Sequence, residues 1–162
     1  MSVIVRAIVY ATLFIGLVLI YVPTRLLAWS GIVRPTTMGV RQIAGIIIGT
    51  AGAVIALWCV VAFARIGKGT PAPFDPPRRL VIRGPYRFVR NPMYIGALLA
   101  LAGAALVYES VPLLAYAVLF LVASHVFVVR YEEPTLRRTF GPAYDAYCHR
   151  VRRWWPVARS TP

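Results

Sequence analysis

The chain has 162 residues, of which 59% are hydrophobic and 14% are charged, and five acidic residues against 18 basic ones give it a formal net charge of +13. A soluble domain of this length could not bury so much apolar surface, so the composition excludes an ordinary soluble fold and predicts that a lipid bilayer solvates much of the chain. Nucleic-acid binding is not expected, because the basic residues lie beside apolar segments rather than on a polar face.

Four apolar segments, in chain order residues 3–22, 43–64, 92–107 and 111–129, predict four transmembrane helices. Pro23 is expected to close the first segment, which lacks a small-residue cleavage site and is interpreted as a retained span. The second segment has 22 uncharged residues, or about 33 Å of helix, which is enough to cross the hydrocarbon region. Only residues 108–110 separate the last two segments, so these should form a tight antiparallel hairpin.

Small residues recur along two of the predicted helices. Three glycines lie in the second segment, and two glycines and an alanine lie in the third: Gly45, Gly49, Gly52, Gly96, Ala100 and Gly103. Such residues let two helix backbones approach closely in a membrane, and helix packing is the simplest interpretation of both series.

The charges predict an orientation. Seven basic residues lie in the loop at 65–93 and seven more in the tail from residue 130, whereas the turn at 109–110 has none. The positive-inside rule therefore places this loop and the tail in the cytoplasm, and four crossings put both termini there. We expect a multi-pass protein, as in a bacterial inner membrane, with residues 1–64 forming two helices and residues 65–162 forming the functional core.

The tail has a helical pattern of its own. The Gly-Pro pair at 141–142 should end one helix and start another, because proline is well tolerated in a first helical turn. Tyr144, Tyr147 and Val151 then fall on one helical face, and the Trp pair at 154–155 suits the headgroup region. Two interpretations stay open, namely an amphipathic helix at the membrane interface and a helix that folds over a cofactor.

The adjacent pair Glu132 and Glu133 is a candidate functional site, because acidic residues are scarce in this chain. We expect the pair to lie where the fourth span leaves the membrane. Neighbouring helical residues diverge by about 100°, so one carboxylate should face a ligand and the other an arginine, although simple charge balance is the alternative. His125 lies about two helical turns before Glu132, so both should project from one face. This histidine either serves the site or hydrogen-bonds a neighbouring helix. Cys59 and Cys148 lack the spacing of metal ligands, and no metal site is expected.

The stretch RGPYRFVRNPMYIGALL at 83–99 opens the third span. Its prolines fix extended turns, and Arg83, Arg87 and Arg90 should crowd the membrane boundary. These arginines either reach phosphate headgroups or clamp an anionic substrate or a cofactor carboxylate, and their spacing does not choose between these roles.

Two blocks, LVIRGPYRFVRNPMYIG and EEPTLRRTFGPAYDAYCHRVRRWWP, give the chain a family resemblance over residues 80–156. The chain resembles the integral membrane methyltransferases that include isoprenylcysteine carboxyl methyltransferases and phospholipid N-methyltransferases. Asn91 stands where the family usually has histidine, as in the phosphatidylethanolamine N-methyltransferase branch, and it weakens any role that needs an imidazole. The residues that carry the shared pattern are Gly84, Tyr86, Arg90, Asn91, Pro92, Tyr94, Gly96, Glu132, Glu133, Phe140, Gly141, Tyr144, Tyr147 and Pro156.

The resemblance implies an all-α integral membrane enzyme without a Rossmann fold that binds S-adenosylmethionine at the cytosolic mouth of the last two helices, under the C-terminal segment. It implies a membrane lipid or another lipophilic molecule as methyl acceptor, either a carboxylate or an amine, and no obligatory protein partner. The catalytic residues that it implies are Arg87, Arg90, Asn91 and Tyr94. The cofactor-binding residues that it implies are Tyr86, Pro92, Gly96, His125, Glu132, Glu133, Tyr144 and Tyr147.

Two other classes of protein share part of the pattern. Membrane sterol-type reductases, which bind NADPH, end in a similar arginine-proline-tyrosine block but typically have more spans. Small carriers of lipophilic cations also have four helices, but they need a carboxylate in mid-membrane, and this sequence has none there.

Overall fold

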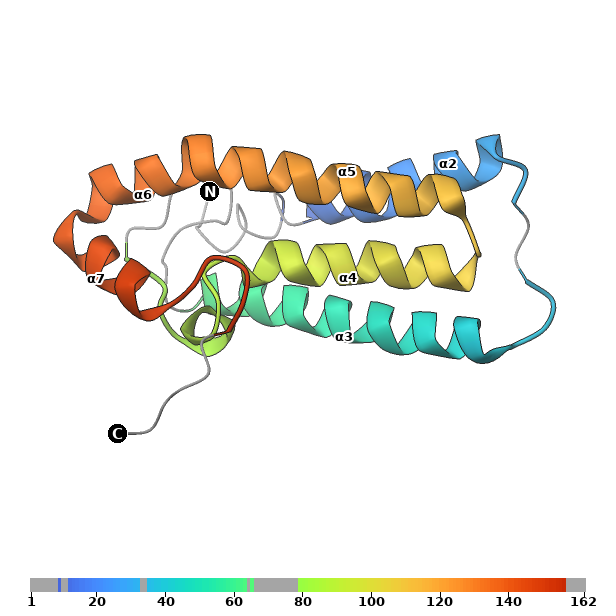
Figure 1. Ribbon diagram of the computed structural model, residues 1–162, viewed down its shortest axis with the longest axis horizontal. Helices are drawn as coiled ribbons and strands as arrows, with labels where there is room; N and C mark the ends of the chain where they lie inside the picture. Colours follow the sequence, from blue (N-terminus) through green and yellow to red (C-terminus); the bar gives the residue numbers. More distant parts are fainter. Residues whose placement is uncertain (1–8, 10–11, 33–34, 64, 66–78, 157–162) are drawn as a thin grey trace.

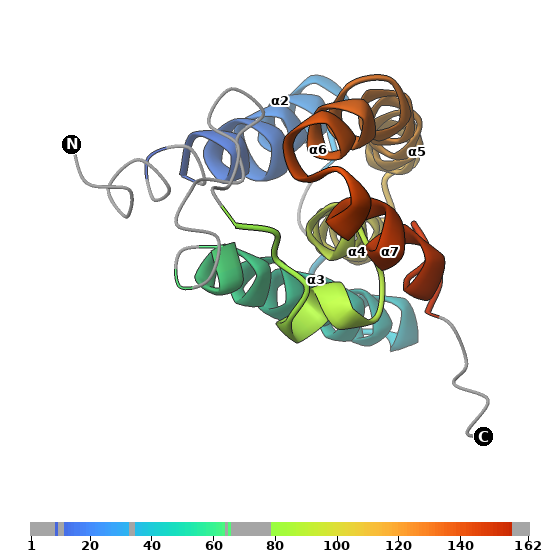
Figure 2. The same ribbon diagram turned by 90° about the vertical axis from the view of Figure 1, so that its left-hand side faces the viewer.

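The computed structural model describes residues 9, 12–32, 35–63, 65 and 79–156, and these residues form helices and connecting turns with no strand. In this part of the chain, α4 lies between α3 on one side and a long helix containing α5 and α6 on the other (Figure 1 and Figure 2). The N-terminal helix, which ends in α2, packs against α5, where the Tyr116 hydroxyl donates to the Val18 carbonyl at 3.2 Å. The prediction of an all-α fold is therefore confirmed.

Three described helical stretches are long and apolar enough to cross a membrane, namely Thr12–Trp29, Val40–Ala62 and Val111–Phe140. A fourth, α4 (Pro92–Val107), is apolar but shorter. The four predicted spans thus correspond to four helices. Residues 66–78 of the predicted basic loop lie outside the described residues.

The first helix runs further than predicted. A π-helical segment, η1 (Ile15–Tyr21), leads directly into α2 (Val22–Trp29), with Pro23 in the first turn of α2. The prediction that Pro23 closes this span is wrong. A change of helical register before a proline lets the chain satisfy the backbone groups that the proline would otherwise leave unpaired, so the helix continues.

The small residues form the contact between α3 (Val40–Ala62) and α4. A Cβ atom on Gly52 would lie 2.5 Å from the Gly96 carbonyl oxygen, and one on Gly103 would lie 2.5 Å from the Gly45 carbonyl oxygen. Both distances are too short for any side chain, so only glycine allows this approach of the two backbones. The interpretation of these residues as a packing seam is confirmed.

The helix that starts at Val111 continues beyond the apolar span of residues 111–129. Ser110 caps it, because its hydroxyl oxygen accepts from the Leu113 N–H at 3.2 Å. Segments α5 (Val111–Phe127), η4 (Val128–Glu132) and α6 (Glu133–Phe140) then follow one another without a break. This helix contains the π-helical segment η4 before Pro134, and it ends at the Gly-Pro pair at 141–142, as predicted.

The tail restarts as predicted. Gly141 has φ +51°, a conformation that favours glycine, and α7 (Pro142–Arg150) begins at the next residue. Tyr144, Tyr147 and Val151 are buried together, which confirms that they share a face. Residues 151–155, which we call the C-terminal strap, then run beside the short helix η3 (Gly84–Arg87) and the start of α4 (Figure 1).

Candidate active site

The start of α4 carries the first half of the site. Pro92 occupies the first helical turn, where its fixed φ suits a helix and its missing N–H costs nothing. The residue before it, Asn91, does not cap the helix with its side chain; instead its Nδ2 donates to the Arg153 carbonyl at 3.3 Å. The Arg90 N–H donates to the Arg152 carbonyl at 2.9 Å. These two bonds join the opening of α4 to the C-terminal strap.

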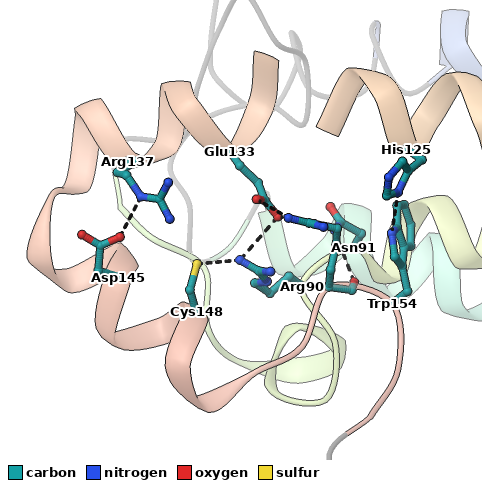
Figure 3. A network of polar contacts seen from close by, with 9 residues as sticks. Arg90, Asn91, His125, Glu133, Arg137, Asp145, Cys148 and Trp154 are labelled. Carbon is teal, nitrogen blue, oxygen red and sulfur yellow. Dashed lines mark hydrogen bonds and ion pairs between the residues drawn. The ribbon is translucent and has the colours of Figure 1, made fainter. Parts of the chain in front are cut away.

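Glu133 carries the second half and lies between two arginines. Its carboxylate accepts from Arg153 Nε at 2.7 Å and from Arg153 Nη2 at 2.8 Å, a two-pronged contact. Arg90 Nη1 lies 3.4 Å from Glu133 Oε1. Figure 3 shows Glu133 and Arg90 pointing toward one another from different elements. The side chains of Glu133 and Arg90 are only 10% and 13% exposed, so this cluster carries one positive charge in excess in a poorly solvated place.

Glu132 turns to a different partner. Its Oε2 accepts a 3.0 Å hydrogen bond from the Tyr94 hydroxyl, and Tyr94 lies in the first turn of α4. The carboxylates of Glu132 and Glu133 therefore diverge, as the angle between neighbouring helical residues requires. The expectation that one member of the pair faces an arginine is confirmed by Glu133. The Glu132 carboxylate, with two oxygens and about four acceptor positions, can accept further bonds from a ligand.

Three tyrosines predicted to bind the cofactor hold the tail in place. The Tyr147 hydroxyl donates to the Tyr86 carbonyl at 2.6 Å, which joins α7 to η3. Tyr144 packs with Tyr147 against Leu136 and neighbouring apolar side chains. Burial raises the pKa of Tyr86, Tyr144 and Tyr147 above the ordinary value, so all three hydroxyls stay neutral at physiological pH.

The structure places three other predicted residues outside this cluster. Gly96 lies in the contact with α3, where a Cβ atom would come 2.7 Å from the Gly52 carbonyl oxygen. Arg87 is exposed, and its guanidinium carbon lies 4.9 Å from the centre of the Phe88 ring. His125 is exposed and its Nδ1 accepts from Trp154 Nε1 at 3.1 Å, so it serves as a hydrogen-bond partner for the strap (Figure 3).

The predicted shared face of His125 and Glu132 assumed a regular α-helix. The π-helical segment η4 begins three residues after His125 and includes Glu132, which changes the number of residues per turn between them. His125 is exposed whereas Glu132 is half-buried. The two residues also bond to different segments, so the sequence spacing does not describe their relationship.

Two residues in the cluster were missed by the sequence reasoning, Arg153 and Cys148. Arg153 supplies the closest ion pair to Glu133, and Arg90 Nη1 donates to the Cys148 sulfur. One signal could have found Arg153: a carboxylate at a membrane boundary needs a cation, and the tail offers three arginines within four residues. Nothing in the sequence marks Cys148.

The cluster has both a hydrogen-bond donor and hydrogen-bond acceptor positions that are free for a ligand. Arg90 Nε is buried and has no hydrogen-bond partner within the part of the chain that the structure describes. A buried donor without a partner is costly, so it marks a place where a ligand's acceptor would be stabilised. Arg90 can therefore bind an anionic group, and Glu132 can accept hydrogen bonds from an ammonium or from hydroxyl groups. Together they suit a ligand that carries both kinds of group.

Comparison with known proteins identifies a family match. A family model described as phospholipid methyltransferase matches residues 40–143, which is more than half of the chain and extends from the start of α3 to the first turn of α7. No curated protein and no solved structure matches the chain. The matched range contains Arg90, Tyr94, Glu132 and Glu133, and it ends before the C-terminal strap.

Proposed function

The chain belongs to the phospholipid methyltransferase family, and from this premise we propose that it transfers a methyl group from S-adenosylmethionine to a lipophilic or lipid acceptor at the cytosolic face of a membrane. The observation that carries the proposal is the meeting of the two sequence blocks at one end of the helices. Arg90 Nη1 lies 3.4 Å from Glu133, and Tyr94 donates to Glu132 at 3.0 Å.

The residues present fit the amino-acid part of S-adenosylmethionine. Arg90, with its buried and unpartnered Nε, would bind the carboxylate. Glu132 would accept hydrogen bonds from the ammonium or from the ribose hydroxyls. Arg87, the other arginine assigned to this role from sequence, is exposed against Phe88, so Arg90 is the better candidate.

When bound, S-adenosylmethionine supplies a methyl group on a sulfonium whose positive charge disperses as the methyl leaves, so a site that excludes water favours the transfer. The chain's own residues would orient the reactants and exclude water from the site. Tyr94 holds the carboxylate of Glu132 in place, and the C-terminal strap is tied across the start of α4 by Asn91 and by the Arg90 N–H. Fixing two reactants in this way provides much of the acceleration in such transfers.

The distribution of charge supports a cytosolic site. The elements η3, α6, α7 and the strap lie at the end of the helices that holds the candidate site (Figure 1). They carry six arginines, namely Arg87, Arg137, Arg138, Arg150, Arg152 and Arg153. At the other end, Arg41 is paired with Glu109 at 3.3 Å. By the positive-inside rule, the end with the excess of arginines faces the cytoplasm.

Two acceptor classes fit the site. A carboxylate acceptor needs no base and could be oriented by an arginine, whereas a protonated amine must first lose its proton to a base. Among the described carboxylates at this end, Glu133 and Asp145 are already in ion pairs. An amine acceptor that used Glu132 as its base would therefore compete with the cofactor for this carboxylate, so the assignment of Glu132 to the cofactor favours a carboxylate acceptor.

The experiment is transfer of labelled methyl from S-adenosylmethionine to a membrane lipid extract by the purified protein. We expect label in the lipid fraction. Release of that label as volatile methanol on mild base treatment identifies a methyl ester, and its retention in a non-volatile product identifies an N-methyl product. The absence of label in any lipid or lipophilic acceptor, from protein that is folded in detergent, would overturn the proposal.

A further inference from the structure

The contact between Arg153 and Glu133 uses both carboxylate oxygens. Arg153 Nε donates to Oε1 at 2.7 Å and Nη2 donates to Oε2 at 2.8 Å, whereas Arg90 reaches only Oε1, at 3.4 Å. Arg153 is thus the main counterion of Glu133 and Arg90 is a secondary one. The planar guanidinium of arginine suits this two-pronged geometry, which lysine cannot reproduce.

Because Arg153 neutralises Glu133 and bonds both of its oxygens, N–H groups of the Arg90 guanidinium remain free to bond other partners. Its Nη1 also donates to the Cys148 sulfur, and its Nε has no hydrogen-bond partner in the described part of the chain. Without Arg153, the poorly solvated Glu133 carboxylate would draw Arg90 into a full ion pair, since an uncompensated buried charge is strongly unfavourable.

The backbone of the strap fixes Arg153 independently of its side chain. The Arg152 carbonyl accepts from the Arg90 N–H, the Arg153 carbonyl accepts from Asn91 Nδ2, and Trp154 donates to His125. A change confined to the Arg153 side chain therefore leaves three attachments of the strap intact. This separates the charge of Arg153 from the position of the strap.

We infer that Arg153 is a positioning residue: by neutralising Glu133 it keeps the Arg90 guanidinium available to the anionic group of the bound ligand, without touching that ligand itself. The inference rests on the proposed function for the identity of the ligand. It assigns a role to a residue outside the part of the chain that the family model matches.

The first experiment measures equilibrium binding of S-adenosylhomocysteine to the detergent-solubilised full chain. Arg153→Gln should weaken binding by about tenfold or more, because Arg90 is then drawn to Glu133. Arg152→Gln is the matched control, since Arg152 is exposed and contributes only its backbone carbonyl. Arg153→Lys keeps the charge but loses the two-pronged contact, so its affinity should lie between those of Arg153→Gln and Arg152→Gln. It also tests the inference if Arg153→Gln does not fold.

The double variant Glu133→Gln/Arg153→Gln separates positioning from direct binding. With no carboxylate to draw it away, Arg90 is available again, so affinity should recover most of the way to that of the wild type. Equal affinity of Arg153→Gln and the wild type would overturn the inference. If the double variant bound S-adenosylhomocysteine as weakly as Arg153→Gln does, the inference would also be overturned, because Arg153 would then act by touching the ligand or by holding the strap.

A second experiment needs no ligand and therefore stands apart from the proposed function. Cys59 is fully buried and Cys148 is half-buried beside Arg90, so iodoacetamide should modify Cys148 first in the folded protein. We expect slower alkylation of Cys148 in Arg153→Gln, because the reactive thiolate is stabilised by the Arg90 guanidinium and Arg90 then leaves the sulfur, and wild-type rates in Arg152→Gln and in the double variant. Unchanged alkylation in Arg153→Gln would contradict the inference, whereas wild-type protein that binds no S-adenosylhomocysteine would contradict the proposed function.

Discussion

The Tyr94 hydroxyl donates a 3.0 Å hydrogen bond to Oε2 of Glu132, and this contact joins α4 to the end of the π-helical segment in the long helix that faces it. Glu132 is the member of the acidic pair that is not committed to an arginine within the described structure, because Arg153 and Arg90 both contact Glu133. The contact with Tyr94 therefore orients the carboxylate that we assign to the ligand.

Tyr94→Phe tests that orientation. The substitution removes one hydrogen bond to a charged group, a contribution of about 1.5–3 kcal/mol, and leaves the ring in place. We expect affinity for S-adenosylhomocysteine to fall by about tenfold or more, together with a lower thermal unfolding midpoint, because the same bond also stabilises the fold. The measurement is a binding titration beside an unfolding curve, and unchanged affinity would show that Tyr94 does not position Glu132.

Glu133→Gln should act mainly on stability. It leaves the Arg90 and Arg153 guanidinium groups close together without their shared counterion. Because Arg153 is 31% exposed, we expect a loss of about 2–3 kcal/mol, less than for a fully buried pair. Thermal unfolding in detergent measures it. The control is Asp145→Asn, which breaks an exposed pair with Arg137 and should change little; similar shifts for both variants would contradict the account.

Arg90→Ala and Arg87→Ala form a matched pair from one short segment. Arg90 lies in the cluster, whereas Arg87 is exposed against Phe88. We expect Arg90→Ala to lower methyl transfer by at least about a hundredfold, because the ligand loses its anchor. The protein should stay folded, since Arg153 still pairs with Glu133. Arg87→Ala should retain activity; equal losses in both variants would assign the effect to general surface charge.

Gly103→Ala tests the seam that positions α4. The new Cβ atom would lie 2.5 Å from the Gly45 carbonyl oxygen, and relieving such overpacking costs about 1–3 kcal/mol. A lower thermal midpoint is expected. Gly16→Ala is the control, because a Cβ atom there meets no atom within 4 Å. If both substitutions had the same effect, the close approach of α3 and α4 would not matter for stability.

The general architecture could be predicted from the sequence because hydropathy, glycine spacing and turn residues act locally. The hairpin, the start of α4 at Pro92 and the restart after Gly141 all follow from short-range rules. The helix end expected at Pro23 was wrong, because a π-helical segment precedes this proline and lets the helix continue. Such register changes leave no mark in a hydropathy profile.

The site was predictable in outline but not in its pairings. The convergence of the arginine block with the acidic pair followed from topology and from the family resemblance. The choice of Arg153 over Arg152 did not, because the strap leaves α7 with an extended Val151, so helical spacing no longer applies. Arg152 is exposed there, whereas Arg153 lies against Glu133.

The most direct test of the account is the binding of S-adenosylmethionine and of NADPH to the purified wild type and to Glu132→Gln. The account predicts saturable binding of S-adenosylmethionine by the wild type, loss of most of that binding in Glu132→Gln with the fold retained, and no binding of NADPH. Binding of NADPH instead, or equal binding of S-adenosylmethionine by the two proteins, would contradict it.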